Sequence, residues 1–251
     1  STSGDASLYD TASLTVDGAS VGSGKTLTIT DGNAGGINQG AGSSNKIAAS
    51  NLAVTDSSGA ITLGNMSNAI GTLALTANGN STVDDSIALE ILGASVGAGN
   101  VLTLYETNGS ITQGAATTNA INASVLTVTD TNGAVVLGNA NNVVGTLALS
   151  ATADSTFDDT TALLLNGIAI SGGHGFTVNA GGNITESAGG STAITAGSLN
   201  ATSTSGAITL SNDSNQIGAA TLSAASDATL HDASAVQIDG ASVGSGNTLT
   251  L

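Results

Sequence analysis

The sequence contains no cysteine, proline, tryptophan or arginine. Without cysteine, disulfide scaffolds, thiolate zinc sites and thiol catalysis are excluded. Lys25 and Lys46 are the only basic residues apart from two histidines, and 18 acidic residues give a formal net charge of −16. Binding to a nucleic-acid backbone depends on positive charge that releases counterions. We therefore expect no nucleic-acid partner.

Long hydrophobic runs and a leader sequence are also missing. No apolar stretch reaches the roughly 18 residues that span a bilayer, so we expect no membrane insertion. The first four residues, Ser-Thr-Ser-Gly, lack the charged-then-apolar pattern of a secretion signal, and we expect any such signal to lie outside this sequence. The apolar content of 40% is too high for a disordered acidic tail.

The chain is a repeat array. Gly18, Gly93, Gly167 and Gly240 open related motifs and are spaced 75, 74 and 73 residues apart. The motif at 17–24 recurs without change at 239–246, which suggests a higher-order duplication of 222 residues. Each unit divides into three segments of about 25, 21 and 29 residues. We expect one continuous solenoid over residues 1–251, with units of about 26–100, 101–174 and 175–247, inside a longer array.

Apolar residues alternate with polar ones, as in Thr26-Leu27-Thr28-Ile29. This period of two predicts strands with one buried face, and Asn-Gly and Gly-Gly pairs mark the turns between them. No stretch has a helical period, so no substantial helix is expected. Segments of this length predict the coils of a single-stranded parallel β-solenoid. Counting each segment as one coil predicts about nine to ten coils of 20–29 residues.

Equivalent positions of the units should stack as inward-facing columns. Phe157 shares its position with Leu8, Val83 and Leu230, and Phe176 shares its position with Leu27, Leu102 and Leu249. Both phenylalanines are therefore expected in the core. On a strand spacing of about 4.8 Å, nine coils predict a rod of roughly 45–50 Å.

The segments 68–75 (Asn-Ala-Ile-Gly-Thr-Leu-Ala-Leu), 142–149 and 206–210 resemble the repeats of filamentous-haemagglutinin-type exoproteins. Those are bacterial surface proteins exported by two-partner secretion, and the resemblance covers essentially the whole chain. It implies a right-handed β-helix, an extracellular or cell-surface location and an adhesive or fibre-forming role. The secretion domain of that family is not in this sequence, and no family site residue can be transferred.

Recurrent aspartates are the candidate metal ligands. An Asp recurs as Asp10, Asp85, Asp159 and Asp232, and it is doubled in two copies by Asp84 and Asp158. Asp84, Asp85, Asp158 and Asp159 are candidates for Ca²⁺, which prefers carboxylate oxygens. The favoured alternative is a turn residue that caps backbone N–H groups, and no other cofactor is expected.

Two further sets of polar residues are best explained by structure. Asn45, Asn68, Asn119, Asn142 and Asn215 recur near the ends of the shorter segments, and their amides are expected to hydrogen-bond along the axis. His174 and His231 occupy variable bend positions and are expected at the surface. A Ser–His–Asp site around His231 and Asp232 is disfavoured, because adjacent strand residues point to opposite sides.

These observations favour a structural and adhesive role over catalysis. The expected function is an extracellular fibre segment of a bacterial surface or secreted protein. Its partners would be other copies or flanking coils at open strand edges, and a host or neighbouring cell. The alternatives are a discrete filament subunit that stacks end to end, and a polysaccharide-binding or polysaccharide-degrading β-helix. An ice-binding face is a fourth option, because Thr26, Thr28 and Thr30 form an outward row.

Overall fold

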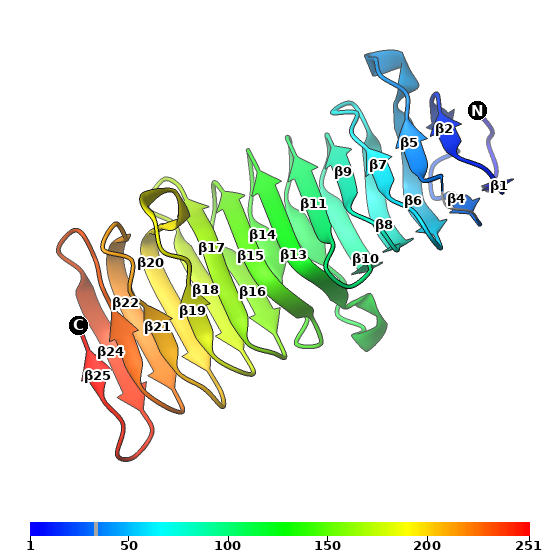
Figure 1. Cartoon of the computed structure of the whole chain (residues 1–251). Helices are drawn as coiled ribbons and strands as arrows, with labels where there is room; N and C mark the ends of the chain where they lie inside the picture. Colours follow the sequence, from blue (N-terminus) through cyan, green and yellow to red (C-terminus); the bar gives the residue numbers. More distant parts are fainter. Residues whose placement is uncertain (33–34) are drawn as a thin grey trace.

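The computed structural model describes residues 1–32 and 35–251 and shows a parallel β-solenoid of about 12 turns. Its 25 strands form one continuous hydrogen-bonded sheet in which every pairing between strands is parallel. The molecule is an elongated rod with its two termini at opposite ends (Figure 1). The described part of the chain has no helix long and apolar enough to cross a membrane.

The strands stack on two faces. We call them the first and second faces and define them by their pairings. The first face holds β1 (Ala6–Asp10), β4 (Thr26–Asp31), β6 (Ile47–Asp56), β8 (Ala69–Ala77), β10 (Leu89–Ser95), β12 (Ile111–Gln113), β14 (Val135–Leu137), β16 (Ser155–Asp159), β18 (Gly175–Ala180), β20 (Ile194–Ser203), β22 (Gln216–Ala224) and β24 (Gln237–Val243).

The second face holds the remaining strands, β2 (Leu14–Val16), β3 (Ala19–Ser20), β5 (Ile37–Gln39), β7 (Ile61–Leu63), β9 (Ser81–Asp85), β11 (Val101–Glu106), β13 (Ile121–Asp130), β15 (Val143–Ala151), β17 (Leu163–Ile170), β19 (Ile184–Glu186), β21 (Ile208–Leu210), β23 (Ala228–Leu230) and β25 (Leu249–Thr250). The six long strands that begin at 47, 69, 121, 143, 194 and 216 cross from one face to the other, so their first residues lie on the face opposite to the rest.

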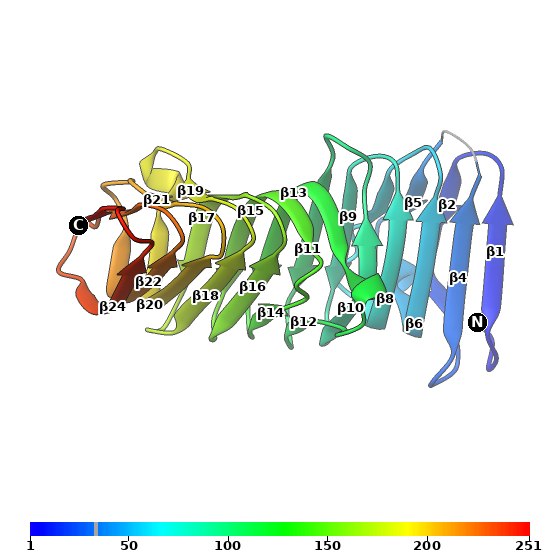
Figure 2. The same ribbon diagram turned by 90° about the horizontal axis from the view of Figure 1, so that it is seen from below.

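The helical content is limited to three single 3₁₀ turns in the described chain: Ser43–Asn45, Thr117–Asn119 and Gly190–Thr192. Each 3₁₀ turn belongs to a loop that bulges from the solenoid. In Figure 1 the first and third of these loops project on one side of the rod and the second projects on the other. Figure 2 shows the same rod from below, with the strands of successive coils side by side.

The alternation of the loops arises because one repeat contains three and a half turns. Leu27, Leu52, Leu73 and Ile91 stack in one column of the first face, which takes three turns. Leu102, the repeat equivalent of Leu27, instead stacks on Ser81 of the second face. Successive units are therefore related by half a turn about the rod axis, in addition to the rise along it.

The predicted count of nine to ten coils is thus wrong. That prediction counts each 29-residue segment as one coil, but each segment forms one and a half turns. Strand β10 returns to the first face above β8, with β9 opposite, before β11 starts the next unit on the second face. Twelve strand levels at about 4.8 Å spacing give a rod of roughly 53 Å, longer than the predicted 45–50 Å.

Interior residues follow the predicted alternation. Phe157 and Phe176 are fully buried, as predicted. The predicted single column of repeat equivalents is wrong, however, because of the half turn: Val83 stacks between strands of the second face, whereas Phe157 stacks between Leu137 and Val178 on the first. Leu8 and Leu249 lie on the two terminal strand levels and are exposed.

Glycine marks the corner where a long strand crosses between faces. At Gly145 of β15, an added Cβ would lie 2.8 Å from the carbonyl oxygen of Ser124, the corner residue of the coil below. Gly71 and Gly218 are in the same situation over Ser50 and Gly197. Only a residue without a Cβ lets two corners approach this closely, which explains the Gly-Thr-Leu-Ala-Leu motif.

Candidate functional site

The doubled aspartates do not converge. Asp85 is fully buried at the end of β9, while Asp84 points outward and is half-buried, because neighbours in a strand face opposite sides. The Asp85 Oδ1 accepts the Ile70 backbone N–H at 3.0 Å. Asp159 Oδ2 accepts the Val144 N–H at 2.7 Å, the same contact one repeat later. These are the contacts of a carboxylate that caps the corner of the coil below.

Burial dominates the electrostatics of these aspartates. It raises the pKa of Asp85 to about 7, against the lowering effect of the N–H groups of Ile70, Ser86 and Ile87 and with a further upward contribution from Glu106. Burial also raises the pKa values of Asp84 and Asp159. Asp158 Oδ1 accepts a hydrogen bond from Asn179 Nδ2 at 2.7 Å. Over residues 1–32 and 35–251, no group of three or more acidic or histidine side chains has a geometry that could hold a metal ion.

A fully buried asparagine secures each of the loops that carry the 3₁₀ turns. Asn142 Oδ1 accepts the Ile121 N–H at 2.7 Å and Gln113 Nε2 at 2.6 Å. Its Nδ2 donates to Gln113 Oε1 at 3.1 Å and to the carbonyl oxygens of Leu137 and Asp158. Gln113 Nε2 also donates to the Asn119 carbonyl, so it ties the loop to the coil above. We call this Gln–Asn pair the amide clamp.

The same amide clamp forms one repeat earlier between Gln39 and Asn68. The recurrent asparagines, expected to hydrogen-bond to one another along the axis, do not do so here, because Asn68 bonds to Gln39 and not to Asn45. Asn45 lies on the loop and directs its amide to the Ala41 carbonyl and to Asp17. The sequence did contain the missing signal, because Gln39 and Gln113 recur at the repeat spacing at the end of a short strand.

In the third unit a glutamate replaces the clamp glutamine. Asn215 Nδ2 donates to Glu186 Oε2 at 3.0 Å, but the other carboxyl oxygen, Oε1, is buried without a hydrogen-bond partner. It occupies the place of the glutamine Nε2, which donates to two oxygens in the other units. Burial raises the pKa of Glu186, and only its protonated form can supply the missing donor.

Both histidines lie at the surface and pair with an aspartate of the coil below. His174 Nδ1 is 3.1 Å from Asp154 Oδ1, and His231 Nδ1 is 2.8 Å from Asp213 Oδ1. The neighbouring Asp232 instead caps the Ile217 N–H. The residues weighed for a Ser–His–Asp site therefore do not form one.

Three acidic side chains stack at the ends of consecutive strands of the second face. Asp85 of β9 is in register with Glu106 of β11, which is in register with Asp130 of β13. All three are at most 1% exposed. We call this arrangement the carboxyl ladder. Glu106 and Asp130 do not belong to the recurrent Asp of the long segments, so the repeat pattern did not reveal the ladder.

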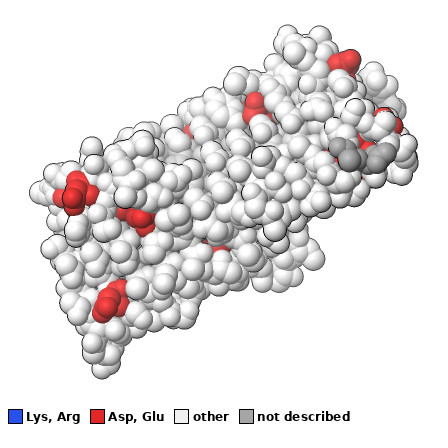
Figure 3. Space-filling model, in the orientation of Figure 1, with Lys and Arg blue, Asp and Glu red and all other residues white. Residues whose placement is uncertain are grey.

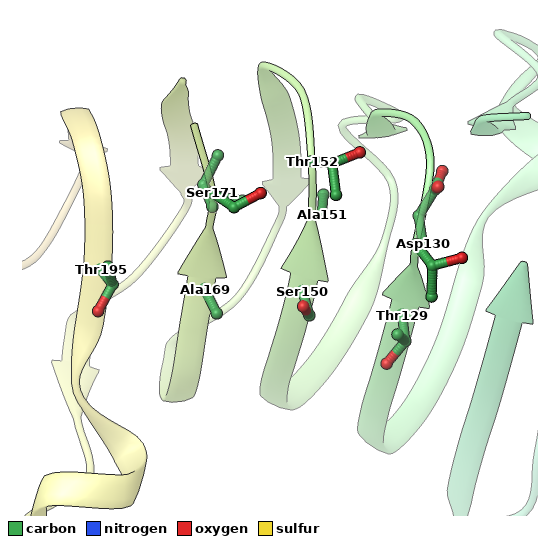
Figure 4. A pocket seen from close by; sticks show the side chains of 10 residues that line it. Thr129, Asp130, Ser150, Ala151, Thr152, Ala169, Ser171 and Thr195 are labelled. Atoms are coloured by element: carbon green, nitrogen blue, oxygen red, sulfur yellow. The ribbon is translucent and has the colours of Figure 1, made fainter. Parts of the chain in front are cut away.

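A shallow groove of about 330 Å³ lies on the outside of the second face, beside Asp130 of the carboxyl ladder. Thr129, Ser150, Ala169 and Thr195 form a row across four neighbouring strands at its floor (Figure 4). The row offers hydroxyl groups but no aromatic side chain or charge. The side of the rod seen in Figure 3 carries isolated acidic patches on an otherwise neutral surface.

The described residues thus provide capped corners, clamped loops and a buried carboxyl stack. Comparison with family models, curated proteins and solved structures finds no match to this chain.

Proposed function

We propose that this chain is a structural and adhesive segment of an extracellular bacterial fibre and has no catalytic role. The observation that carries the proposal is the continuous parallel pairing of the strands. It runs from β1 to β25 with inward residues in register on every level. Such an array transmits force and resists local opening, because each internal level is held by the levels on both sides.

The loops provide the adhesive part of the proposal. They project alternately on opposite sides of the rod (Figure 1), and the amide clamp fixes each clamped loop to the body of the solenoid. A rigid body with fixed projecting loops is a suitable arrangement for contact with another surface. The resemblance to filamentous-haemagglutinin repeats supports the same role.

The location can be tested on the producing bacterium with antibodies against residues 1–251. Labelling of intact cells, removed by external protease, is the expected result. Labelling that appears only after permeabilisation would contradict the proposal. As a control, antibodies against a cytoplasmic protein should label only permeabilised cells.

The adhesive role needs a separate test. Beads coated with the purified chain are expected to attach to the surfaces that the producing bacterium colonises, and soluble chain should compete for that attachment. Beads coated with heat-denatured chain provide the control. Equal attachment of native and denatured chains would show that the folded surface is not responsible.

A further inference from the structure

The carboxyl ladder places three acidic groups one above another in the interior. Consecutive members belong to neighbouring strand levels, about 4.8 Å apart. Asp130 is well supplied with donors, because Oδ1 accepts the Asn132 N–H at 3.0 Å and Oδ2 accepts the Ile111 N–H at 3.2 Å. The site therefore suits an ionised carboxylate at Asp130.

Glu106 has fewer hydrogen-bond donors than Asp130. Its Oε1 accepts the Asn108 N–H at 2.5 Å, but its Oε2 is buried without a donor. Glu106 and Asp130 are in register on neighbouring strands, and the two buried carboxyl groups affect each other's pKa. Two ionised carboxylates would repel in that position, whereas a protonated Glu106 could donate to Asp130.

Within residues 1–32 and 35–251, no cation compensates the carboxyl ladder. The strands packed around it, β7, β8, β12, β14 and β15, contain no acidic, basic or histidine residue. Asp84 and Tyr105, on the ladder strands themselves, point outward, as does Glu90 on β10 of the first face. The ion pairs found in the described chain are those of the two histidines at the surface.

We propose that Glu106 is protonated in the folded protein at neutral pH and donates its proton to Asp130, so that the solenoid is strengthened by acid and weakened as the ladder ionises. Burial, together with the neighbouring Asp130, raises the pKa of Glu106. Burial likewise raises the pKa of Asp130, and that of Asp85 to about 7.

The direction of the pH dependence follows from these shifts. A carboxyl group whose pKa is higher in the folded state binds more protons there than in the unfolded chain. Its stabilising contribution is complete below the ordinary values of 3.8 for Asp and 4.5 for Glu and is lost as pH rises through the folded value, about 7 for Asp85. Stability should therefore fall between about pH 4 and pH 8.

The third unit supplies a matched comparison within the chain. There the equivalent column is Asp159, Ala180 and Ser203. Ser203 Oγ accepts the Gly206 N–H at 3.0 Å and donates to the Gly182 carbonyl at 2.7 Å, so it makes turn contacts without a charge. The double variant Glu106→Ala, Asp130→Ser would give the second unit the alanine and serine that the third unit has at these positions.

The test is denaturant unfolding of the whole chain at about pH 5 and about pH 8. For the wild type we expect a clearly lower midpoint at the higher pH. Glu106→Gln, which keeps a donor towards Asp130 at every pH, and the double variant should each make that decrease measurably smaller, while burial of Asp85, Asp159 and Glu186 maintains the remainder. Glu90→Gln makes the same change of charge on the outward side of β10 and should retain the wild-type decrease.

A second measurement does not depend on variant stability. The infrared difference between wild type and Glu106→Gln at neutral pH should contain the carbonyl band of a protonated carboxyl group. A carboxylate band in its place, or a pH dependence that is the same in wild type and in both ladder variants, would overturn the proposal.

Discussion

Leu27 and Leu102 occupy the same position in successive units, yet they lie on opposite faces of the solenoid. Leu27 stacks under Leu52 on the first face, whereas Leu102 stacks on Ser81 of the second. The half turn between units is therefore a property of the repeat length. It predicts how the chain responds to changes of length.

Deletion of residues 101–174, one complete unit, should give a folded and shorter rod. The new junction joins residue 100 to Gly175, which starts a unit as Val101 does, and β18 would stack on β9 in the way that β11 does. The rod should shorten by about 17 Å, measurable by small-angle scattering.

The control deletion removes residues 101–180 and therefore also strand β18. The next strand would then meet the wrong level, and we expect loss of cooperative unfolding. If both deletions behaved alike, the unit would not be the structural period.

Gly145→Ala should destabilise the protein by about 1–3 kcal/mol, because the new methyl group would press on the Ser124 carbonyl oxygen at 2.8 Å. Gly138→Ala is the matched control, since its Cβ would have its nearest neighbour at 3.7 Å. That change should stay within about 0.5 kcal/mol. Chemical denaturation of the two variants compares them directly, and equal effects would exclude the corner contact as the cause.

Asn142→Ala should cost about 3 kcal/mol, because it leaves the Ile121 N–H and the Gln113 amide buried without their partner. The adjacent Asn141 is exposed, and Asn141→Ala should change stability by less than about 0.5 kcal/mol. Hydrogen exchange at Ile121 provides a local measurement. Unchanged protection there would show that the amide clamp does not hold this corner.

Glu186→Gln should stabilise the protein at neutral pH by about 1 kcal/mol, since it restores the donor found in the other two units. Because burial raises the pKa of Glu186, the wild-type glutamate is a better donor in acid. The gain should therefore shrink as pH falls below the folded pKa. Gln113→Glu, the reverse change, should destabilise most at high pH, and a pH-independent effect of both would contradict the explanation.

The period of two predicted the strands, the buried phenylalanines and the solenoid itself, because burial of one strand face is a local property of sequence. The number of turns could not be obtained in the same way. A 29-residue segment can form one turn or one and a half turns of the solenoid. Which of these it forms depends on the pairing of β10 with β8. Segment length alone does not encode that contact.

The polar sites were predicted less well because their partners are distant in sequence. Asn68 and Gln39 are 29 residues apart, and only the shared repeat spacing connects them. Glu106 and Asp130 continue the inward alternation of their strands, at positions where Ala151 and Ala180 stand in other coils. An acidic residue at such a position is the sequence signal for a buried carboxyl group.

The half turn also determines how a longer array of such units would look to a partner. A feature carried once per unit would face alternate directions, and copies on the same side would recur after seven turns, about 34 Å along the axis. Two approaching surfaces on opposite sides would thus meet identical features without any rotation of the rod. An array built in this way would present the same features on both sides. A bivalent partner would need to match the interval of about 34 Å to bind two copies on one side.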